Sequence, residues 1–172
     1  MKEILIMIKI TVLSDTHMPR MSKTLPAQLL QDIQDSDLIF HAGDWSDISV
    51  YEELTSMGKV YGVTGNTDLI MLRGILPEQT IVEAGGKRFG LVHGHHGKGS
   101  TEANALAAFS GEQVDCIIFG HSHIPLLKQN GNCILFNPGS PTDKRRQPQY
   151  SHGVITIDDD IHAEHVFYDN KS

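Results

Sequence analysis

The stretch Val114-Asp-Cys-Ile-Ile-Phe-Gly-His-Ser-His123 decides how the rest of the chain is interpreted. Its first part is mainly apolar, with the β-branched and aromatic side chains that are typical of a buried strand. Gly120 ends this strand, and two histidines follow at once. Residues i and i+2 of an extended chain point the same way, so we expect His121 and His123 to face one point beyond the strand. Ligand sites of α/β sheets tend to lie at this carboxyl end.

Length and composition indicate an ordinary globular protein. At 172 residues, the chain is expected to form one domain, residues 1–172, with a sizeable hydrophobic core. Its residues are 40% hydrophobic and 20% charged, which is typical of that class. The net charge of −7 argues against a nucleic-acid polymer as partner, because no block of basic residues stands out.

The cysteines and the N-terminus indicate the compartment. Cys116 and Cys133 lie in apolar, strand-like runs, and we expect them to be buried free thiols in a reducing cytoplasm. Met1–Ile10 is apolar but interrupted by three charged residues, and no small-residue cleavage site follows it. We therefore expect this segment to lead into the first strand, as neither a signal peptide nor a membrane span. A cytoplasmic protein without a membrane partner is predicted.

The first half of the chain repeats a strand–loop–helix pattern. Asp47 suits the N-cap of the second helix, while Thr24 is a candidate cap of the first and Pro26 suits its first turn. Such units predict a largely parallel sheet with right-handed crossovers. The expected strands and helices alternate at residues 8–14, 25–33, 38–41, 48–57 and 59–63.

The second half carries signals of antiparallel pairing. Gly85-Gly86 and Asp158-Asp159-Asp160 each separate two strand-like runs, and both predict a hairpin. A helix is expected at 101–109, and further strands at 114–119 and 133–136. Helices concentrated in the first half, with antiparallel pairs in the second, predict an α/β fold of two packed mixed sheets with helices outside.

Polar side chains that can bind a metal follow five of the expected strands. They supply oxygen and imidazole donors but no thiolate, which argues against a structural zinc site of the cysteine type. Each cluster by itself is also explained by a turn or a helix cap. Their recurrence at five strand ends instead indicates one shared site. The residues are Asp15, His17, Asp44, Asn66, Asp68, His93, His121 and His123.

In chain order, these residues form five motifs that resemble those of the calcineurin-like metallophosphoesterases. The motifs are Asp15-x-His17, Gly43-Asp44, Gly65-Asn66, His93-Gly94-His95 and Gly120-His121-x-His123. The short chain and its Asn137-Pro-Gly-Ser140 stretch resemble the small bacterial and archaeal phosphodiesterase branch, to which the retromer scaffold subunit is related. The resemblance covers nearly the whole chain. It implies a four-layer α/β/β/α sandwich of two mixed β-sheets flanked by helices.

The resemblance also implies a centre for two divalent metal ions. Manganese is expected first, and nickel, iron, cobalt and zinc also suit nitrogen and oxygen ligands. A bridging carboxylate would offset the repulsion between two dications roughly 3.5–4 Å apart, and the remaining positive charge would attract a phosphate ester. The implied ligands are Asp15, His17 and His123 for one ion, Asn66, His93 and His121 for the other, and Asp44 as the bridge.

The implied function is a phosphodiesterase that hydrolyses phosphate diesters with a metal-bound hydroxide. The expected substrate is a small phosphodiester such as a nucleotide, and self-association of the chain stays open. Many family members carry histidine after the Gly-Asn step, whereas Thr67 follows Asn66 here. Threonine cannot act as a general acid near pH 7, so we predict better turnover of esters with good leaving groups. His95 and His96 are expected behind the ligands or at the surface.

Two further residues complete the candidate catalytic set with Asp44 and Asn66. Asp68 is expected to orient a ligand, although a turn or a helix cap would also explain it. Arg145 follows the last ligand pair and is a candidate phosphate ligand, because a guanidinium binds phosphate oxygens through two hydrogen bonds. A basic trio such as Lys144–Arg146 is, however, commonly a solvated loop.

Two other functions would use the same fold. A phosphomonoesterase is ranked below the diesterase, because Thr67 stands where a histidine is common. A weakly active or non-catalytic scaffold would be favoured by an exposed apolar patch. All seven implied ligand positions carry residues that can bind a metal, and this favours an enzyme over a scaffold.

Overall fold

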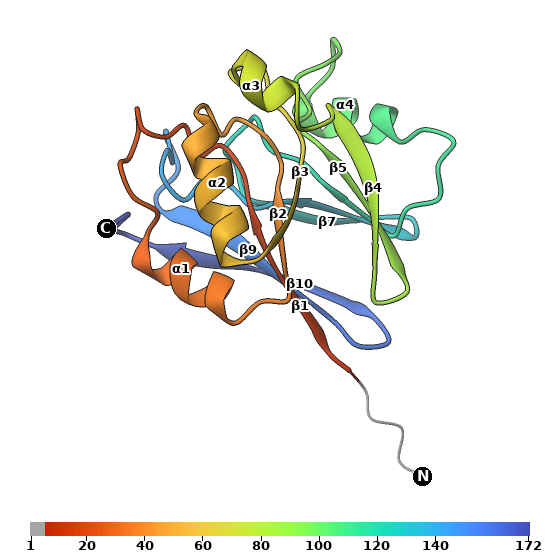
Figure 1. Cartoon of the computed structure of the whole chain (residues 1–172). Coiled ribbons are helices and arrows are strands. Elements are labelled where there is room, and N and C mark those ends of the chain that lie inside the picture. The colour runs from red at the N-terminus through yellow and green to blue at the C-terminus, as the bar shows by residue number, and fades with distance from the viewer. Residues whose placement is uncertain (1–5) are drawn as a thin grey trace.

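The computed structural model describes residues 6–172, and residues 1–5 lie outside its description, so the expectation for Met1–Ile10 is tested only from residue 6. Two five-stranded sheets form the centre of the molecule (Figure 1). The first sheet has the order β10-β9-β1-β2-β3, in which β1, β2 and β3 are parallel, β9 is antiparallel to β1, and β10 is antiparallel to β9. Its strands are β1 (Ile8–Leu13), β2 (Leu38–His41), β3 (Lys59–Gly62), β9 (Tyr150–Ile157) and β10 (Ile161–Tyr168).

The second sheet is also mixed and has the order β4-β5-β6-β8-β7. The hairpin of β4 and β5 forms one edge, β5, β6 and β8 run parallel, and β7 returns antiparallel along β8. Both hairpins predicted at Gly85-Gly86 and at Asp158–Asp160 are present. The strands are β4 (Gln79–Ala84), β5 (Lys87–Val92), β6 (Cys116–Ile118), β7 (Leu126–Asn130) and β8 (Cys133–Asn137).

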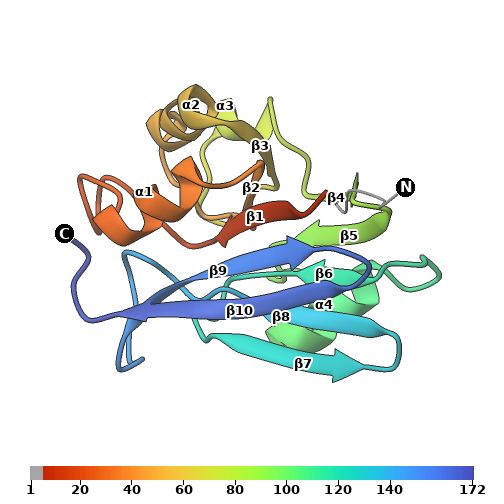
Figure 2. The ribbon, with the colours of Figure 1, turned by 90° about the horizontal axis from the view of Figure 1, so that it is seen from below.

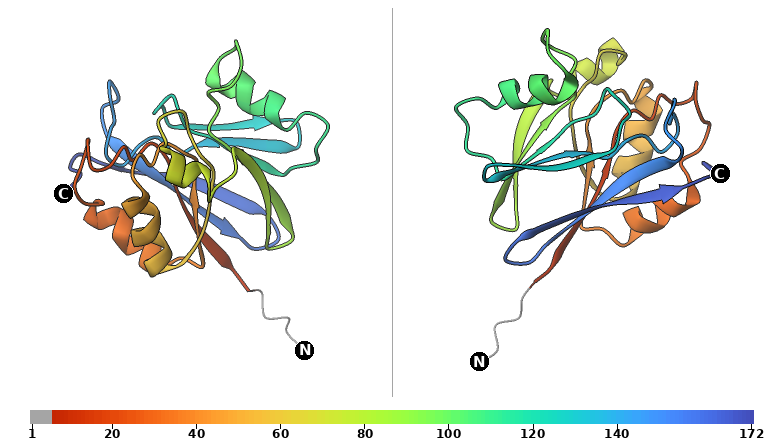
Figure 3. Two further views of the ribbon diagram at one scale, coloured as in Figure 1. Left: turned by 45° about the horizontal axis from the view of Figure 1, so that its top comes forward. Right: turned by 180° about the vertical axis from the view of Figure 1, so that it is seen from behind.

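Helices cover the outer faces of the two sheets. Figure 2 shows α1 and α2 together above the first sheet, and Figure 3 shows α4 on the far side of the second sheet from them. The expected four-layer α/β/β/α sandwich is therefore confirmed. The helices are α1 (Ala27–Gln34), α2 (Ile48–Met57), α3 (Ile70–Arg73) and α4 (Thr101–Ala108).

Alternation along the strands divides the core into layers. Successive side chains of a strand point to opposite faces, so Ile39 packs under the helices while its neighbour Phe40 packs between the sheets. On β6, Ile118 likewise faces the first sheet and Ile117 faces α4. A strand buried on both faces reads as a continuous apolar run, which explains the sequence Cys-Ile-Ile-Phe before Gly120.

Several local expectations need correction. Thr24 is not the cap of α1, since Pro26 occupies the N-cap position without a side-chain capping bond. The strand expected at 114–119 is shorter and spans Cys116–Ile118, although the backbone of Asp115 still bonds to Arg88 and Ile134 on the neighbouring strands. β7 was not expected, because it is a mostly exposed edge strand with polar residues. The short helix α3 was not expected either.

The thiols and the helices bear on the predicted compartment. Cys116 is a buried free thiol, and burial raises its pKa. Cys133 is free but only half-buried, so the expectation of two buried thiols is wrong for this residue. No helix within residues 6–172 combines the length and the apolar character needed to cross a membrane.

A buried polar network lies beneath α1, away from the strand ends. His152 on β9 contacts the Asp32 carboxylate through Nε2 at 2.7 Å and the Tyr168 hydroxyl through Nδ1 at 3.2 Å. Lys9 also pairs with Asp32, at 3.2 Å. Burial lowers the pKa of His152 below its ordinary value of 6.5, and the carboxylate of Asp32 opposes this only in part. The folded protein therefore holds His152 neutral.

Acidification should destabilise the protein partly through His152. As the pH falls below 6.5, the unfolded chain gains a proton at this residue before the folded protein does, so folding stability is lost. The loss from one group is at most about 1.4 kcal/mol per pH unit. Urea unfolding at pH 7.5 and 5.5 should show a smaller loss in His152→Gln, which keeps a donor and an acceptor. Equal losses in the two proteins would contradict this assignment.

Candidate metal centre

The loops that follow β1, β2, β3, β5 and β6 meet at one end of the two sheets. Backbone hydrogen bonds join them directly: the Asp15 N–H donates to Gly43 O at 2.9 Å, and the Gly120 N–H donates to His93 O at 3.1 Å. The His17 N–H similarly donates to Asp44 O at 3.1 Å. Residues that are far apart in the sequence are thus brought together at the carboxyl ends of parallel strands, where they were expected.

The backbone at these loops is unusual. Among residues 6–172, seven residues other than glycine have a positive φ, a conformation that is costly for L-residues outside glycine. Five of the seven are candidate metal ligands. Strain that gathers on residues with metal-binding side chains indicates a functional site whose geometry the surrounding fold imposes. The five are Asp15 (57°), His17 (43°), Asp44 (58°), His121 (68°) and His123 (61°).

The first group of donors consists of Asp15, His17 and His123. One ligand atom from each lies within 4.8 Å of those of the other two. Asp15 Oδ1 is 3.4 Å from His123 Nε2 and 3.8 Å from His17 Nε2. Asp15 is fully buried and His123 almost so. Such a set of one carboxylate and two imidazoles suits a divalent transition metal.

The second group consists of Asp44, His93 and His121, again with ligand atoms within 4.8 Å of one another. Asp44 Oδ2 lies 3.1 Å from His93 Nε2 and also 3.5 Å from His17 Nε2, so this carboxylate reaches both groups. Asn66 is exposed and adds an amide oxygen 3.2 Å from His121 Nδ1. All seven predicted ligand positions are therefore gathered in one place.

The two histidines of the opening stretch do not follow the expected extended path. β6 ends at Ile118, and both His121 and His123 adopt left-handed backbone conformations. The chain therefore turns between them instead of running straight. As a result, His123 joins the first group and His121 joins the second, instead of both facing one point.

Several buried donor atoms at the centre have no hydrogen-bond partner within residues 6–172. They are Asp15 Oδ1 and the Nε2 atoms of His17, His93 and His123. Buried polar atoms are costly when unsatisfied, and a cluster of four indicates a missing ligand. Backbone carbonyls explain their orientation: His93 Nδ1 lies 2.8 Å from Ala42 O, and His123 Nδ1 contacts Asp143 O. With the Nδ1 proton bound there, each Nε2 offers a lone pair to a metal.

Charge at the centre favours a cation. Burial raises the pKa of Asp44, but the close contact and charge of His93 outweigh this effect and hold it well below the usual range. Burial likewise lowers the pKa of His93, but Asp15 and Asp44 raise it to about 9. The pocket therefore stabilises positive charge beside two carboxylates. A bound metal would take the place of that proton on Nε2.

Asp68 holds the loops that carry Asp44 and Gly65. Its carboxylate accepts the N–H groups of Gly65 at 2.7 Å, Ser46 at 2.8 Å and Asp44 at 3.0 Å. Burial raises the pKa of Asp68, while the same three hydrogen bonds lower it in part. The expectation that Asp68 orients a ligand fits this geometry better than that of a solvated turn.

Asp68→Ala should destabilise the protein by about 2–4 kcal/mol, because it leaves two buried N–H groups and one partly buried N–H group without an acceptor. Asp68→Asn keeps one acceptor oxygen and should lose less. Denaturant unfolding in EDTA measures the effect without any contribution from metal binding. Asp159→Ala, in the exposed β9–β10 turn, is the matched control. An unchanged unfolding free energy in Asp68→Ala would show that these hydrogen bonds are dispensable.

Other residues, outside the five ligand motifs, support the centre. His41 stacks on Trp45 with ring centroids 3.7 Å apart, and its Nδ1 accepts the Gly43 N–H at 3.1 Å. Ser140 Oγ donates to Asp15 O at 2.7 Å, and Asn137 Nδ2 donates to Gly120 O at 3.1 Å. Only the Asn-Pro-Gly-Ser stretch gave a signal for the last two. His41 stood out only by its position before the Gly43-Asp44 motif.

The remaining predicted residues lie around the rim. Thr67 donates its backbone N–H to Asp44 Oδ1 at 3.0 Å, and its side chain shares a cavity with His17 and Arg145. His95 is half-buried, 6.2 Å from His121 between ring centroids. Burial and the charge of His93 lower the pKa of His95 to about 4. His96 is exposed and lies 3.5 Å from Glu78, at the surface as expected.

Two stacked mixed sheets with carboxylate, amide and imidazole donors clustered at their strand ends define an α/β/β/α sandwich with a candidate metal centre. Residues 8–160 match the calcineurin-like phosphoesterase superfamily domain. A probable metallophosphoesterase of Methanocaldococcus jannaschii is 32% identical over 156 residues, which cover 90% of this chain and 79% of that protein. The chain therefore belongs to the calcineurin-like phosphoesterase superfamily.

Solved structures share this fold at lower sequence identity. A structure described as a novel archaeal phosphodiesterase superposes with a TM-score of 0.74 at 20% identity, covering 94% of this chain and 100% of that one. Vps29 from Entamoeba histolytica, crystallised in complex with Zn²⁺, superposes with a TM-score of 0.70 at 23% identity, covering 93% and 99%. At these identities the likeness establishes the fold alone.

Proposed function

We propose that the chain is a phosphodiesterase that depends on two divalent metal ions. One observation carries this proposal: the single carboxylate of Asp44 lies within 3.5 Å of His17 from one donor group and within 3.1 Å of His93 from the other. A carboxylate shared by two groups of donors suits a pair of cations. Manganese is the metal proposed first, and nickel, iron, cobalt and zinc fit the same donors.

Seven side chains would hold the two ions. When bound, the pair would supply Lewis-acid activation of water and neutralise charge on the phosphate oxygens. The protein's part is to orient the donors: Ala42 O and Asp143 O fix the rings of His93 and His123. The ligands are Asp15, His17 and His123 in one group, Asn66, His93 and His121 in the other, and Asp44 between them.

Metal analysis followed by an ester panel tests the proposal. Protein from which EDTA has removed the metal should bind two ions per chain when it is separated from the EDTA and reloaded with Mn²⁺. It should then hydrolyse bis(p-nitrophenyl) phosphate, and p-nitrophenyl phosphate more slowly. Turnover confined to the monoester would assign a phosphomonoesterase instead. Two bound ions without turnover of any ester would contradict an enzyme.

Turnover should depend strongly on the leaving group. Thr67 is exposed at the rim and carries no group that can protonate a departing alcohol near pH 7. Across a series of diesters, a rise of several units in the pKa of the departing alcohol should therefore lower kcat by orders of magnitude. Thr67→His should flatten this dependence, because an imidazole can act as a general acid. A flat dependence in the unaltered protein would contradict the prediction.

A non-catalytic scaffold is the second candidate, and one surface favours it. Four large apolar side chains in and around α3 are exposed, among them Ile70, which is 84% exposed. Figure 1 shows α3 at the upper edge of the molecule, beside the loop that follows β3. A protein with both ions bound and no esterase activity would fit this role. The four residues are Leu69, Ile70, Met71 and Ile75.

A further inference from the structure

Two arginines line a cavity that opens directly beside the candidate metal ligands. The cavity has a volume of about 300 Å³, and His17 of the first donor group forms part of its wall. A substrate phosphate held at the metal centre would therefore border this space. The lining residues are His17, Arg20, Met21, Thr67, Asp143 and Arg145.

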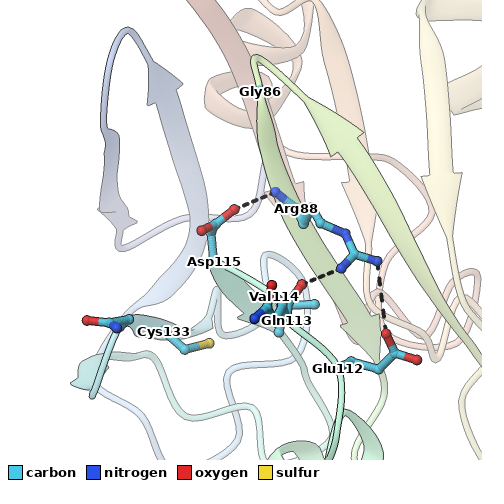
Figure 4. Close-up of a pocket in the computed structure, with 8 residues that line it drawn as sticks. Gly86, Arg88, Glu112, Gln113, Val114, Asp115 and Cys133 are labelled. Atoms are coloured by element: carbon cyan, nitrogen blue, oxygen red, sulfur yellow. Dashed lines mark hydrogen bonds and ion pairs between the residues drawn. The ribbon is translucent and has the colours of Figure 1, made fainter.

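Neither guanidinium in this cavity is used for folding. Arg20 and Arg145 are exposed, and within residues 6–172 neither forms an ion pair or a side-chain hydrogen bond. Arg88 shows the contrast, at the opposite end of β5 (Figure 4). It ion-pairs with Glu83 and Glu112 and donates to the carbonyl of Gln113. The charge of Arg88 is thus neutralised by the protein, whereas two charges beside the metal centre are left for a ligand.

Charge in the cavity remains positive after its own carboxylate is counted. Asp143 is the one acidic residue among those that line it, and its carboxylate lies 3.8 Å from His123 Nδ1. Two arginines line the cavity with this single acidic residue. A dense anion with several oxygens suits such a pair, because each guanidinium can donate two parallel hydrogen bonds to it.

Tertiary contacts hold the two arginine-bearing loops together. Lys171, near the C-terminal end of the chain, donates from Nζ to the carbonyl oxygens of Met21 and Thr142. Met21 follows Arg20 directly, and Thr142 lies three residues before Arg145. A pair of guanidinium groups on tethered loops is better prepared for binding than two free surface side chains, because less freedom is lost.

The geometry points to a second anion subsite: Arg20 and Arg145 bind a phosphate group that the substrate carries in addition to the diester at the metal centre. This inference rests on the proposed phosphodiesterase function and narrows its substrate class to diesters that bear a second phosphate, such as phosphorylated nucleotide diesters. Thr67 contributes by its small size, since an imidazole at this position would fill part of the cavity.

A matched pair of substrates tests the subsite. The p-nitrophenyl ester of thymidine 5′-phosphate and its 3′-phosphorylated form share one leaving group and differ by one phosphate. The Mn²⁺-loaded protein should prefer the phosphorylated form by about tenfold in kcat/KM. Arg20→Met should remove most of this preference by raising KM. Arg146→Met is the control, because Arg146 is exposed on the same loop as Arg145 and borders the neighbouring cavity that Arg145 also lines, but it does not line the subsite cavity.

Direct binding separates this inference from the proposed function. Calorimetry of metal-free protein with inorganic pyrophosphate should detect binding that weakens about tenfold in Arg20→Met and in Arg145→Met, but not in Arg146→Met. The subsite would be overturned if pyrophosphate affinity were the same in both variants as in the unaltered protein. It would also be overturned if the unaltered protein neither bound pyrophosphate nor preferred the phosphorylated substrate. Turnover of bis(p-nitrophenyl) phosphate without any preference for the phosphorylated substrate would support the phosphodiesterase and reject the subsite. Pyrophosphate binding without turnover would retain the subsite and reject the phosphodiesterase.

Discussion

Asp44→Ala is expected to abolish metal binding and ester hydrolysis together. The Asp44 carboxylate lies between the two donor groups, 3.5 Å from His17 Nε2 and 3.1 Å from His93 Nε2. Without it, two dications would approach each other with no shared anionic ligand. We expect elemental analysis to find almost no bound ions, and kcat to fall by about 10³-fold or more.

Thermal unfolding supplies a second measurement for this variant. Metal that binds only the folded protein raises its unfolding temperature. The unaltered protein should therefore show a clear rise on addition of Mn²⁺, and Asp44→Ala should show almost none. Asp159→Ala, at the exposed β9–β10 turn, should keep the full rise and full activity. Retained activity in Asp44→Ala would refute the bridging assignment.

Gly120→Ala is expected to disrupt the first donor group although it removes no ligand. A Cβ at this position would lie 2.0 Å from Ser14 Oγ and 2.6 Å from Asp15 Oδ2. That carboxylate oxygen also accepts the His121 N–H at 3.0 Å and the Ser14 hydroxyl at 2.8 Å. Both contacts must shift to admit one methyl group. We expect metal affinity to fall at least about 10–100-fold, the loss typical when the support of a ligand is removed.

Metal titration followed by calorimetry measures this effect, and unfolding in EDTA reports the accompanying loss of stability. That loss should be about 1–3 kcal/mol, as for other overpacked sites. Gly74→Ala is the matched control, since its Cβ would make only ordinary contacts at 3.6 Å and its backbone is right-handed. Unchanged metal affinity in Gly120→Ala would show that the Asp15 loop moves freely away from the β6 end.

Much of the fold could be predicted from local patterns. Leu38-Ile-Phe40, before Asp44, is a continuous apolar run, as a strand covered on both faces requires, whereas Lys9 and Thr11 interrupt the strand before Asp15. Gly85-Gly86 marked its hairpin, since paired glycines meet the backbone demands of a tight turn. β7 was not predicted, because an edge strand exposed to water has few apolar residues to mark it in the sequence.

The residues of the candidate site could be predicted, and the family resemblance also divided them between two ions. Every implied ligand lies in one of two compact groups or between them, because parallel strands deliver their carboxyl ends to one edge. The path of the chain at His121 and His123 was not predictable, since left-handed φ values there are imposed by neighbouring loops. Arg20 gave no signal at all, because its partner in the cavity lies on a loop more than a hundred residues away.

The stretch Val114–His123 separates what local sequence determines from what tertiary structure determines. By itself, the sequence determined a buried strand, a glycine at its end and two imidazoles beyond it, because residue types and spacing set local geometry. The family resemblance assigned the two imidazoles to different ions, but tertiary structure alone decided the turn that places His121 beside Asp44 and His123 beside Asp15. The reason is physical: Asp15 Oδ2 accepts the His121 N–H and packs where a Cβ of residue 120 would lie. Contacts between distant loops bend the chain there.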